Sequence, residues 1–363
     1  MSGFVISTWS AVSPFGIGRA SFERGLTQQA STAAEPGGED EWGPLPAGTY
    51  LPVPGFSARE VLGKKGTRSM DRVSALAVTT IRELLEENAH SSAVATGERA
   101  ALVLGTTTGS VKSMMDITRD TLIHEKPFYI DAARIPNAIM NSAAAQCAIW
   151  HQIKGPNTTV AGGRVAPLLA LRYSLRLLAA ERAKAALCGG AEELSAPRAW
   201  LEHHGRSAAE PAAPLGEGCA LLLVEPAAEA QGSALADVLA VETGIHTGAD
   251  LRHSLIECLR RAVARTGVTL DDVWAVSSVP GEGPLGDAER AAVDDVFGSP
   301  KIQRIQGARL WGDAGAATAA FQTVSVLSSA QASAEAAGRV AVVVSVDRDG
   351  VLGCALLRMR ARS

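Results

Sequence analysis

Sulfur is the first side-chain chemistry to consider in this chain, because a thiolate can act as a nucleophile or a metal ligand. The five cysteines are widely scattered, with no pair at CxxC spacing and no histidine placed to complete a zinc site. Each lies in an apolar helical or strand-like stretch or at the start of a strand: Cys147, Cys188, Cys219, Cys258 and Cys354. We therefore expect reduced core thiols, with neither a nucleophile nor a metal ligand among them.

No cofactor signature is present. The glycine-rich stretch Gly105–Gly109 matches neither a P-loop nor a dinucleotide fingerprint, so we expect no nucleotide, flavin or metal. Hydrophobic residues make up 47% of the 363 residues, charged residues 20%, and the net charge is −4. This composition argues against disorder and nucleic-acid binding. No apolar run approaches the roughly 20 residues of a membrane span, and the N-terminus does not read as a signal peptide. We expect a cytoplasmic protein that binds no membrane.

Short apolar strands alternate with glycine turns and alanine-rich helices, a pattern typical of an α/β fold. The predicted strands are Phe4–Ser7, Ala100–Leu104, Thr158–Val160, Ala185–Cys188, Ala220–Val224, Leu235–Glu242, Val273–Val279, Ile302–Ile305, Val340–Val346 and Gly353–Arg358. The predicted helices are Arg72–Asn88, Pro167–Ala180, Leu251–Thr266 and Gly315–Ala330.

The strand–helix order is roughly the same in two halves, 1–225 and 234–363, which we expect to pack as one unit. A polar, small-residue stretch between them, Pro226–Ser233, is a candidate hinge. Two segments rich in Pro, Gly and Ala, Gln28–Gly55 and Arg206–Pro214, are predicted to be surface loops.

Several stretches, in order along the chain, resemble the β-ketoacyl synthase family of the thiolase fold. They include the opening strand and turn, Arg68–Arg72, Leu104–Gly109, Ile135–Asn137, Lys154–Val160, Cys188–Glu193, Leu215–Gly218 and Gly312–Ala316. Any one of these stretches alone could be an ordinary glycine-rich turn of an α/β protein. Together, they follow one another in the order found in the family. The resemblance implies a duplicated fold with five αβαβα layers.

The catalytic residues of the family are missing from this chain. By register, the nucleophilic cysteine falls on Arg164 and the two histidines fall on Pro280 and Arg309, while the family's lysine falls on Arg304. A guanidinium cannot act as the nucleophile, and proline has no side-chain donor. The loop that borders the nucleophile in active members is replaced by Val346–Gly350. The resemblance therefore implies a chain that is no enzyme by itself.

Within the family, chain length factors of type II polyketide synthases keep the fold without the cysteine. The resemblance implies a heterodimer with an active ketosynthase, with an acyl carrier protein acting mainly through that partner and the growing acyl chain in a shared tunnel. The strand Asn157, Thr158, Thr159 and Val160 is expected at the dimer axis. Tunnel residues are expected on the first turns of the helix after Gly109: Thr108, Val111, Lys112, Met114 and Met115. Of these, Thr108, Val111 and Met115 are expected to share one face of the helix.

A buried arginine at the nucleophile position requires a carboxylate. We predict that Arg164 pairs with Glu282, Asp347 or Asp349 and plugs the old pocket; the alternative is an Arg164 that points to solvent. Three other functional interpretations stay open. The chain could be an active enzyme whose register is misjudged, a homodimeric binding or scaffold protein of the thiolase fold, or an acyltransferase with a non-standard active site.

Overall fold

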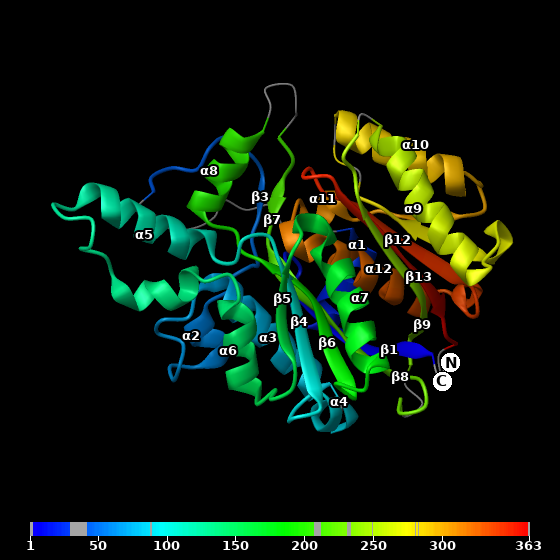
Figure 1. Ribbon diagram of the computed structural model, residues 1–363, viewed down its shortest axis with the longest axis horizontal. Helices are drawn as coiled ribbons and strands as arrows, with labels where there is room; N and C mark the ends of the chain where they lie inside the picture. Colours follow the sequence, from blue (N-terminus) through cyan, green and yellow to red (C-terminus); the bar gives the residue numbers. More distant parts are fainter. Residues whose placement is uncertain are drawn as a thin grey trace.

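A computed structural model describes residues 3–29, 42–87, 89–206, 212–230, 234–248, 250–279, 281 and 283–361. A large central sheet is flanked by helices on its faces (Figure 1). Most of its strands are buried along nearly their whole length, because helices cover both faces. The mixed α/β class and the thiolase-like arrangement of the elements confirm the predicted fold class.

The N-terminal half contributes five strands in the order β5-β4-β6-β8-β1. Their bounds are β1 (Phe4–Ser13), β4 (Ala100–Thr106), β5 (Asn157–Ala161), β6 (Ala185–Glu192) and β8 (Gly218–Pro226). β4 is parallel to β5 and β6, whereas β8 is antiparallel to both β6 and β1. β5 is the outermost strand, so one of its edges is unpaired within the described chain.

The C-terminal half repeats this topology with strands in the order β11-β10-β12-β13-β9. Their bounds are β9 (Ala236–Ile245), β10 (Val273–Ser277), β11 (Gln303–Ile305), β12 (Val340–Val346) and β13 (Val351–Met359). The pairing directions match strand for strand, and β1 pairs with β9 to join the two halves into one sheet. The internal repeat is thus visible in the strand order itself, while the boundary at 225–234 stays a prediction.

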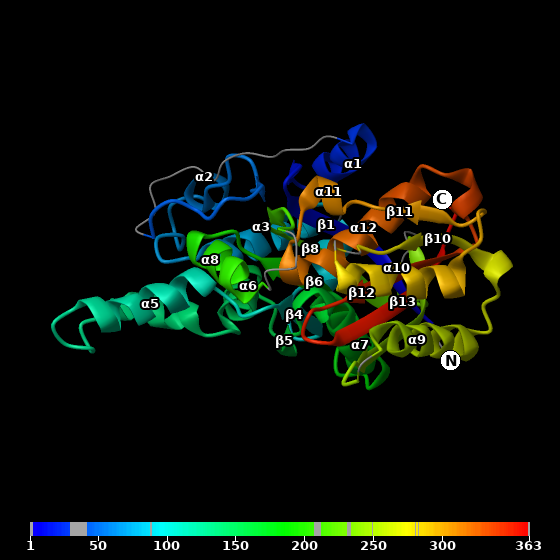
Figure 2. The ribbon, with the colours of Figure 1, turned by 90° about the horizontal axis from the view of Figure 1, so that it is seen from above.

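Helices form three layers around the two halves of the sheet (Figures 1 and 2). The middle layer holds the corresponding helices α7 (Ala166–Ala179) and α12 (Thr318–Gln331), which contact each other. On one outer side lie α3 (Arg72–Glu86) and α6 (Ser142–His151), and on the other lie α9 (Leu251–Thr266) and α10 (Pro284–Phe297).

The remaining short helices are α1 (Arg19–Gln28), α2 (Ala58–Leu62), α4 (Ala89–Val94), α8 (Ala196–Gly205) and α11 (Ala308–Trp311). The 3-10 turns are η1 (Ala132–Ala138), η2 (Gly163–Val165), η3 (Leu270–Asp272), η4 (Gly315–Ala317) and η5 (Ala334–Ala336), and the short strands are β2 (Gly16–Ile17), β3 (Tyr50–Leu51) and β7 (Leu215–Gly216). Helix α5 (Val111–Ile123) and the segment that follows it project from the body in both views (Figures 1 and 2).

All ten predicted strands and all four predicted helices are present; the bounds of Val340–Val346 and Leu251–Thr266 are as predicted, and the others are shifted at one or both ends. β1 is longer than predicted, since it continues to Ser13 and pairs with β8 as far as Val12. The first predicted helix ends at Glu86, and Asn88 lies outside the described residues. The predicted loop Gln28–Gly55 contains the short strand β3, and the predicted loop Arg206–Pro214 leads into β7. Residues 30–41 and 207–211 of these loops lie outside the described residues, and so do residues 231–233 of the candidate hinge.

Candidate functional site

The position of interest is the turn between β5 and α7. The strand runs from Asn157 to Ala161, and the 3-10 turn η2 then carries Arg164 into the first turn of α7. Gly163 in this turn has a φ of +51°, and a Cβ there would lie 2.0 Å from the Asp347 Oδ2 atom. Glycine is therefore required twice, by the left-handed backbone and by the carboxylate that lies against it.

Arg164 forms a two-pronged ion pair with Asp313. Its Nε donates to Oδ1 at 3.2 Å and its Nη2 donates to Oδ2 at 2.5 Å. The Arg164 side chain is 20% exposed to solvent and the Asp313 side chain 13%. A paired, bidentate arrangement of this kind is the condition under which an arginine can be buried.

For Asp347 and Asp349, the prediction that they pair with the guanidinium was wrong. Its carboxylate comes from Asp313, in the turn before α12, and not from the loop that contains Asp347 and Asp349. Asp347 does contact Arg164, but it accepts the backbone N–H of Arg164 at 2.8 Å and the backbone N–H of Asp349 at 3.1 Å. Its carboxylate is therefore occupied by backbone donors. The third predicted partner, Glu282, lies outside the described residues.

The charges around the pair shift the pKa values of its members. The Asp313 carboxylate, together with Asp347 and Glu289, raises the pKa of Arg164 against the effect of burial. Burial acts to raise the pKa of Asp313, but Arg164 outweighs it and holds that pKa well below its usual range. Burial raises the pKa of Glu289 to about 7, although Arg164 and the Val279 N–H act to lower it. Arg164 is thus a permanent cation and Asp313 a permanent anion at neutral pH.

The β12–β13 turn is fixed over this position. Besides the Asp347 contact, the Ser345 hydroxyl donates to the carbonyl oxygen of Arg164 at 3.2 Å. Arg348, at the tip of the turn, forms an ion pair with Glu202 on α8. Contacts from Ser345, Asp347 and Arg348 therefore hold this turn between η2 and α8.

The other predicted positions lie in different surroundings. Arg309 is exposed on α11 and is not buried with the Arg164–Asp313 ion pair. Arg304 donates to Asp294 and to the carbonyl oxygen of Phe297, which ties it to α10. Pro280 lies outside the described residues. Arginine can donate at these places, but no imidazole is present to take or return a proton.

All five cysteines are fully buried, as the sequence predicts. Burial raises the pKa of the Cys188 and Cys219 thiols to about 12, and it also raises the pKa of Cys147. Cys258 and Cys354 interact with each other between α9 and β13, where a hydrogen bond from Cys354 lowers the pKa of Cys258. None of these thiols lies on the turn that opens α7.

Helix α5 begins one residue after its N-cap, Ser110, whose hydroxyl accepts the Ser113 N–H. Thr108 therefore precedes the helix, and the prediction that Thr108 shares a helical face with Val111 and Met115 was wrong. Val111 is 4% exposed and is buried within this chain, whereas Thr108 and Met114 are exposed and Met115 is half-buried. Lys112 is half-buried and forms an ion pair with Asp116. Thr108, Met114 and Met115 remain candidates for a surface completed by a partner.

The exposed apolar surface of the described chain is concentrated in one segment, residues 114–149, which follows the start of α5. Most of the exposed large hydrophobic side chains belong to it: Met114, Leu122, Ile123, Phe128, Tyr129, Ile135, Ile139, Met140 and Ile149. Exposed apolar side chains that form a contiguous patch are typical of interaction surfaces. The edge strand β5 is close to it in sequence and is only half-buried along Thr158, Thr159 and Val160.

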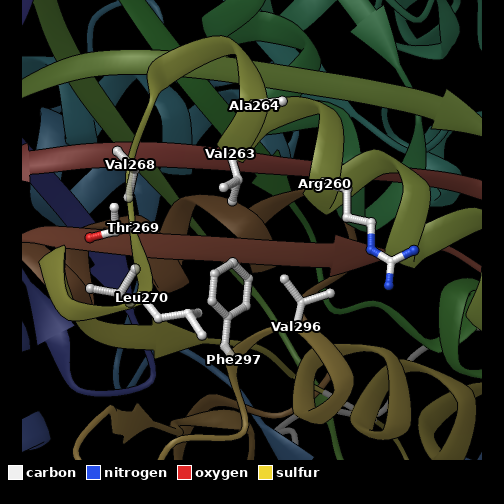
Figure 3. A pocket seen from close by; sticks show the side chains of 9 residues that line it. Arg260, Val263, Ala264, Val268, Thr269, Leu270, Val296 and Phe297 are labelled. Carbon is white, nitrogen blue, oxygen red and sulfur yellow. The ribbon is translucent and has the colours of Figure 1, made fainter.

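A shallow apolar cavity of about 250 Å³ lies elsewhere, between α9 and α10 (Figure 3). Its walls include Val263, Leu270 and Phe297, with Arg260 at one side. Arg164 and the acidic residues around it do not line this cavity. Within the described ranges, no group of three or more His, Cys, Asp or Glu residues could hold a metal ion. No helix of the described part is both long and apolar enough to cross a membrane.

Comparison with known proteins agrees with this architecture. The protein-family model described as the N-terminal domain of β-ketoacyl synthase matches residues 5–230 of this chain. The chain belongs to the β-ketoacyl synthase family. A chain of the ishigamide ketosynthase/chain length factor has 44% sequence identity with a TM-score of 0.92, and the match covers 99% of this chain and all of that one.

More distant members are also similar. The 3-oxoacyl-[acyl-carrier-protein] synthase 2 of Vibrio cholerae is 24% identical over 40% of this chain, which spans about a third (35%) of that relative's length. The corresponding synthase of Rhizobium meliloti is 24% identical over 90% of this chain and 86% of its own. The ketosynthase in the AntDE:AntF complex, at 16% identity and a TM-score of 0.79, shares the fold.

As a member of this family, the chain has a ketosynthase-like frame with an arginine ion pair at the turn that opens α7. Asp313 was missed by the sequence analysis, although it stands inside the Gly312–Ala316 turn that carried part of the resemblance. Its acidic side chain was the available signal. Glu289 gave no such signal, because only the packing of α10 brings it near Arg164.

Proposed function

We propose that this chain is a non-catalytic, chain length factor-like subunit that forms a heterodimer with an active β-ketoacyl synthase of a type II polyketide synthase. The observation that carries the proposal is Arg164, ion-paired with Asp313 at the position where the family resemblance places the nucleophile. The absence of a cysteine on that turn, together with the burial of all five cysteines, supports a chain that forms no thioester intermediate of its own. Loss of a nucleophile costs about 10⁶ in rate in a well-studied hydrolase.

The proposed partner interface consists of the edge strand β5 and the exposed apolar surface of residues 114–149. An unpaired strand edge presents backbone donors and acceptors that another strand can satisfy. The exposed apolar side chains supply the burial that a stable interface needs. The named ishigamide ketosynthase/chain length factor, at 44% identity, supports an active ketosynthase as the occupant.

In this proposal the chain contributes shape rather than chemistry. Thr108, Met114 and Met115 are exposed or half-buried at the start of α5, next to the interface. They would form part of the wall of an acyl tunnel that begins at the partner's cysteine, with methionine adapting to an alkyl chain. The acyl carrier protein would deliver its thioester to the partner, where the nucleophile is.

Co-expression with a ketosynthase that has an intact cysteine and two histidines tests the proposal. We expect a one-to-one complex that elongates an acyl carrier protein-bound chain, whereas this chain alone and the ketosynthase alone do not. Replacing the partner's cysteine by alanine should abolish elongation.

Two results would contradict the proposal. Condensation of malonyl and acyl thioesters by this chain alone would show an active enzyme with a non-standard site. A stable homodimer that binds no ketosynthase and adds nothing to elongation would instead favour a scaffold or binding protein.

A further inference from the structure

The Arg164–Asp313 ion pair is connected to a buried arginine. The carbonyl oxygen of Asp313 accepts from Arg198 Nη2 at 3.0 Å, and Arg198 Nη1 donates to the carbonyl oxygens of Glu193 and Gly216 at 2.8 and 2.7 Å. Arg198 is only 4% exposed. Its three hydrogen bonds therefore fix the Asp313 turn relative to the end of β6.

A second path starts from the carboxylate of Asp313. Its Oδ1 atom accepts the Gly315 N–H at 3.1 Å, which holds the start of η4. The next residue, Ala316, donates its N–H to Glu192 Oε2 at 3.1 Å, and the Thr107 hydroxyl donates to the same oxygen. The Asp313 turn and the loop before α5 thus share one buried carboxylate.

Both paths end at the start of α5. The Glu193 carboxylate accepts the Lys112 N–H at 2.8 Å and the Ser110 hydroxyl at 3.2 Å, so it fixes the first turn of the helix. Glu192 fixes Thr107, the neighbour of Thr108. The two adjacent glutamates are each 1% exposed, and they bridge the Asp313 turn to the segment that carries the tunnel-wall residues.

We propose that Arg164 is a positioning residue for the tunnel wall. In this proposal, which rests on the proposed function, the ion pair that replaced the nucleophile holds the Asp313 turn, and that turn holds the loop 107–110 and the first turn of α5. Loss of the guanidinium leaves the Asp313 carboxylate without its cation in a nearly dry site, so the turn must rearrange. The tunnel wall then moves although no tunnel residue has changed.

The test uses the assembled heterodimer and compares Arg164→Gln with the wild-type chain. We expect the complex to form and the ratio of the main product to its two-carbon neighbours to fall by about 2- to 30-fold, the range of measured couplings through buried networks. Arg164→Lys keeps the charge but loses the two-pronged geometry, so it should restore only part of the ratio. The matched control is Arg252→Gln, which breaks the two-pronged, exposed Arg252–Asp295 pair between α9 and α10.

Hydrogen exchange provides a readout that does not depend on product analysis. The Lys112 amide should exchange faster in Arg164→Lys than in Arg252→Gln, because its acceptor, Glu193, lies on the path from Arg164. This measurement still decides the matter if Arg164→Gln fails to fold.

The outcomes separate the two proposals. If the wild-type chain does not support elongation, the proposed function fails. If it does, but the Arg164 variants give the wild-type product ratio and the wild-type exchange at Lys112, the positioning role fails while the proposed function stands. A lower melting temperature with an unchanged product ratio assigns Arg164 a role in stability alone.

Discussion

The guanidinium of Arg164 bonds both carboxylate oxygens of Asp313, and the two residues come from corresponding turns of the internal repeat. Arg164 lies in η2, from which α7 continues, and Asp313 lies two residues before η4, from which α12 continues. The ion pair therefore joins the two halves of the molecule at the point where their middle-layer helices begin. The charge pair thus holds together the two turns from which α7 and α12 begin.

Restoring a cysteine should not restore activity. Arg164→Cys removes the ion-pair partner of the Asp313 carboxylate and supplies no imidazole, so we expect no condensation by the chain alone. We also expect a loss of about 3 kcal/mol in the free energy of unfolding, at the lower end for a broken buried pair because both side chains keep some exposure. Urea unfolding and a condensation assay measure the two effects.

The matched control for this prediction is the double variant Arg164→Met with Asp313→Leu. Since it removes both charges, it should be more stable than Arg164→Met alone. Equal stability of the single and double variants would contradict the idea that the uncompensated carboxylate is the cause.

Stability should fall as the pH rises from about 4.5 to about 7. Burial raises the pKa of Glu193 and of Glu289 to about 7, so the folded chain holds protons that the unfolded chain releases near its usual carboxyl pKa of 4.5. Each group then contributes a slope of at most about 1.4 kcal/mol per pH unit. Urea unfolding at pH 5, 6, 7 and 8 measures this slope, and Glu289→Gln should flatten it because an amide resembles the protonated acid.

Asp313 should have the opposite effect in acid. Its pKa lies well below the usual value of 3.8, since Arg164 outweighs burial, so its contribution is complete above that value and is lost as the pH falls below it. The folded chain should therefore lose stability below pH 4, and Asp313→Asn should lose less over that range. Identical acid profiles for the two chains would contradict this assignment.

Enlarging the proposed tunnel wall should shorten the product. Thr108 is exposed in the isolated chain and lies two residues before the N-cap of α5, so a phenylalanine there would extend into the space beside the partner. We expect Thr108→Phe to shift the main product by at least one two-carbon unit, measured by mass spectrometry of the reconstituted pair. Thr247→Phe, an exposed site in the other half, is the control and should leave chain length unchanged.

A charge on the exposed apolar surface should prevent assembly. Phe128 is 70% exposed in the segment 114–149, and burying an aspartate there would cost several kcal/mol. Phe128→Asp should therefore abolish copurification with the ketosynthase without lowering the melting temperature of this chain. Leu270→Asp, at an exposed hydrophobic residue near α9, should copurify normally; equal behaviour of the two variants would place the interface elsewhere.

Strand and helix positions were predictable because burial on both faces leaves long apolar runs such as Ala100–Leu104 and Val340–Val346 in the sequence. Helix ends were less predictable. The start of α5 depends on the Ser110 cap and on Glu193, a residue about 80 positions away, so the local pattern placed Thr108 inside the helix when it lies before it.

The sequence by itself determined the residue types: an arginine after the Asn157–Val160 strand, no cysteine near it, and two runs of the same strand–helix order. Which carboxylate answers that arginine was decided only by tertiary structure. From the sequence, Glu282, Asp347 and Asp349 were equally good candidates for its partner. In the structure, the Asp347 carboxylate instead accepts backbone N–H groups. The packing of α7 against α12 brings Asp313 within bonding distance of the guanidinium, because the internal repeat sets the two turns face to face.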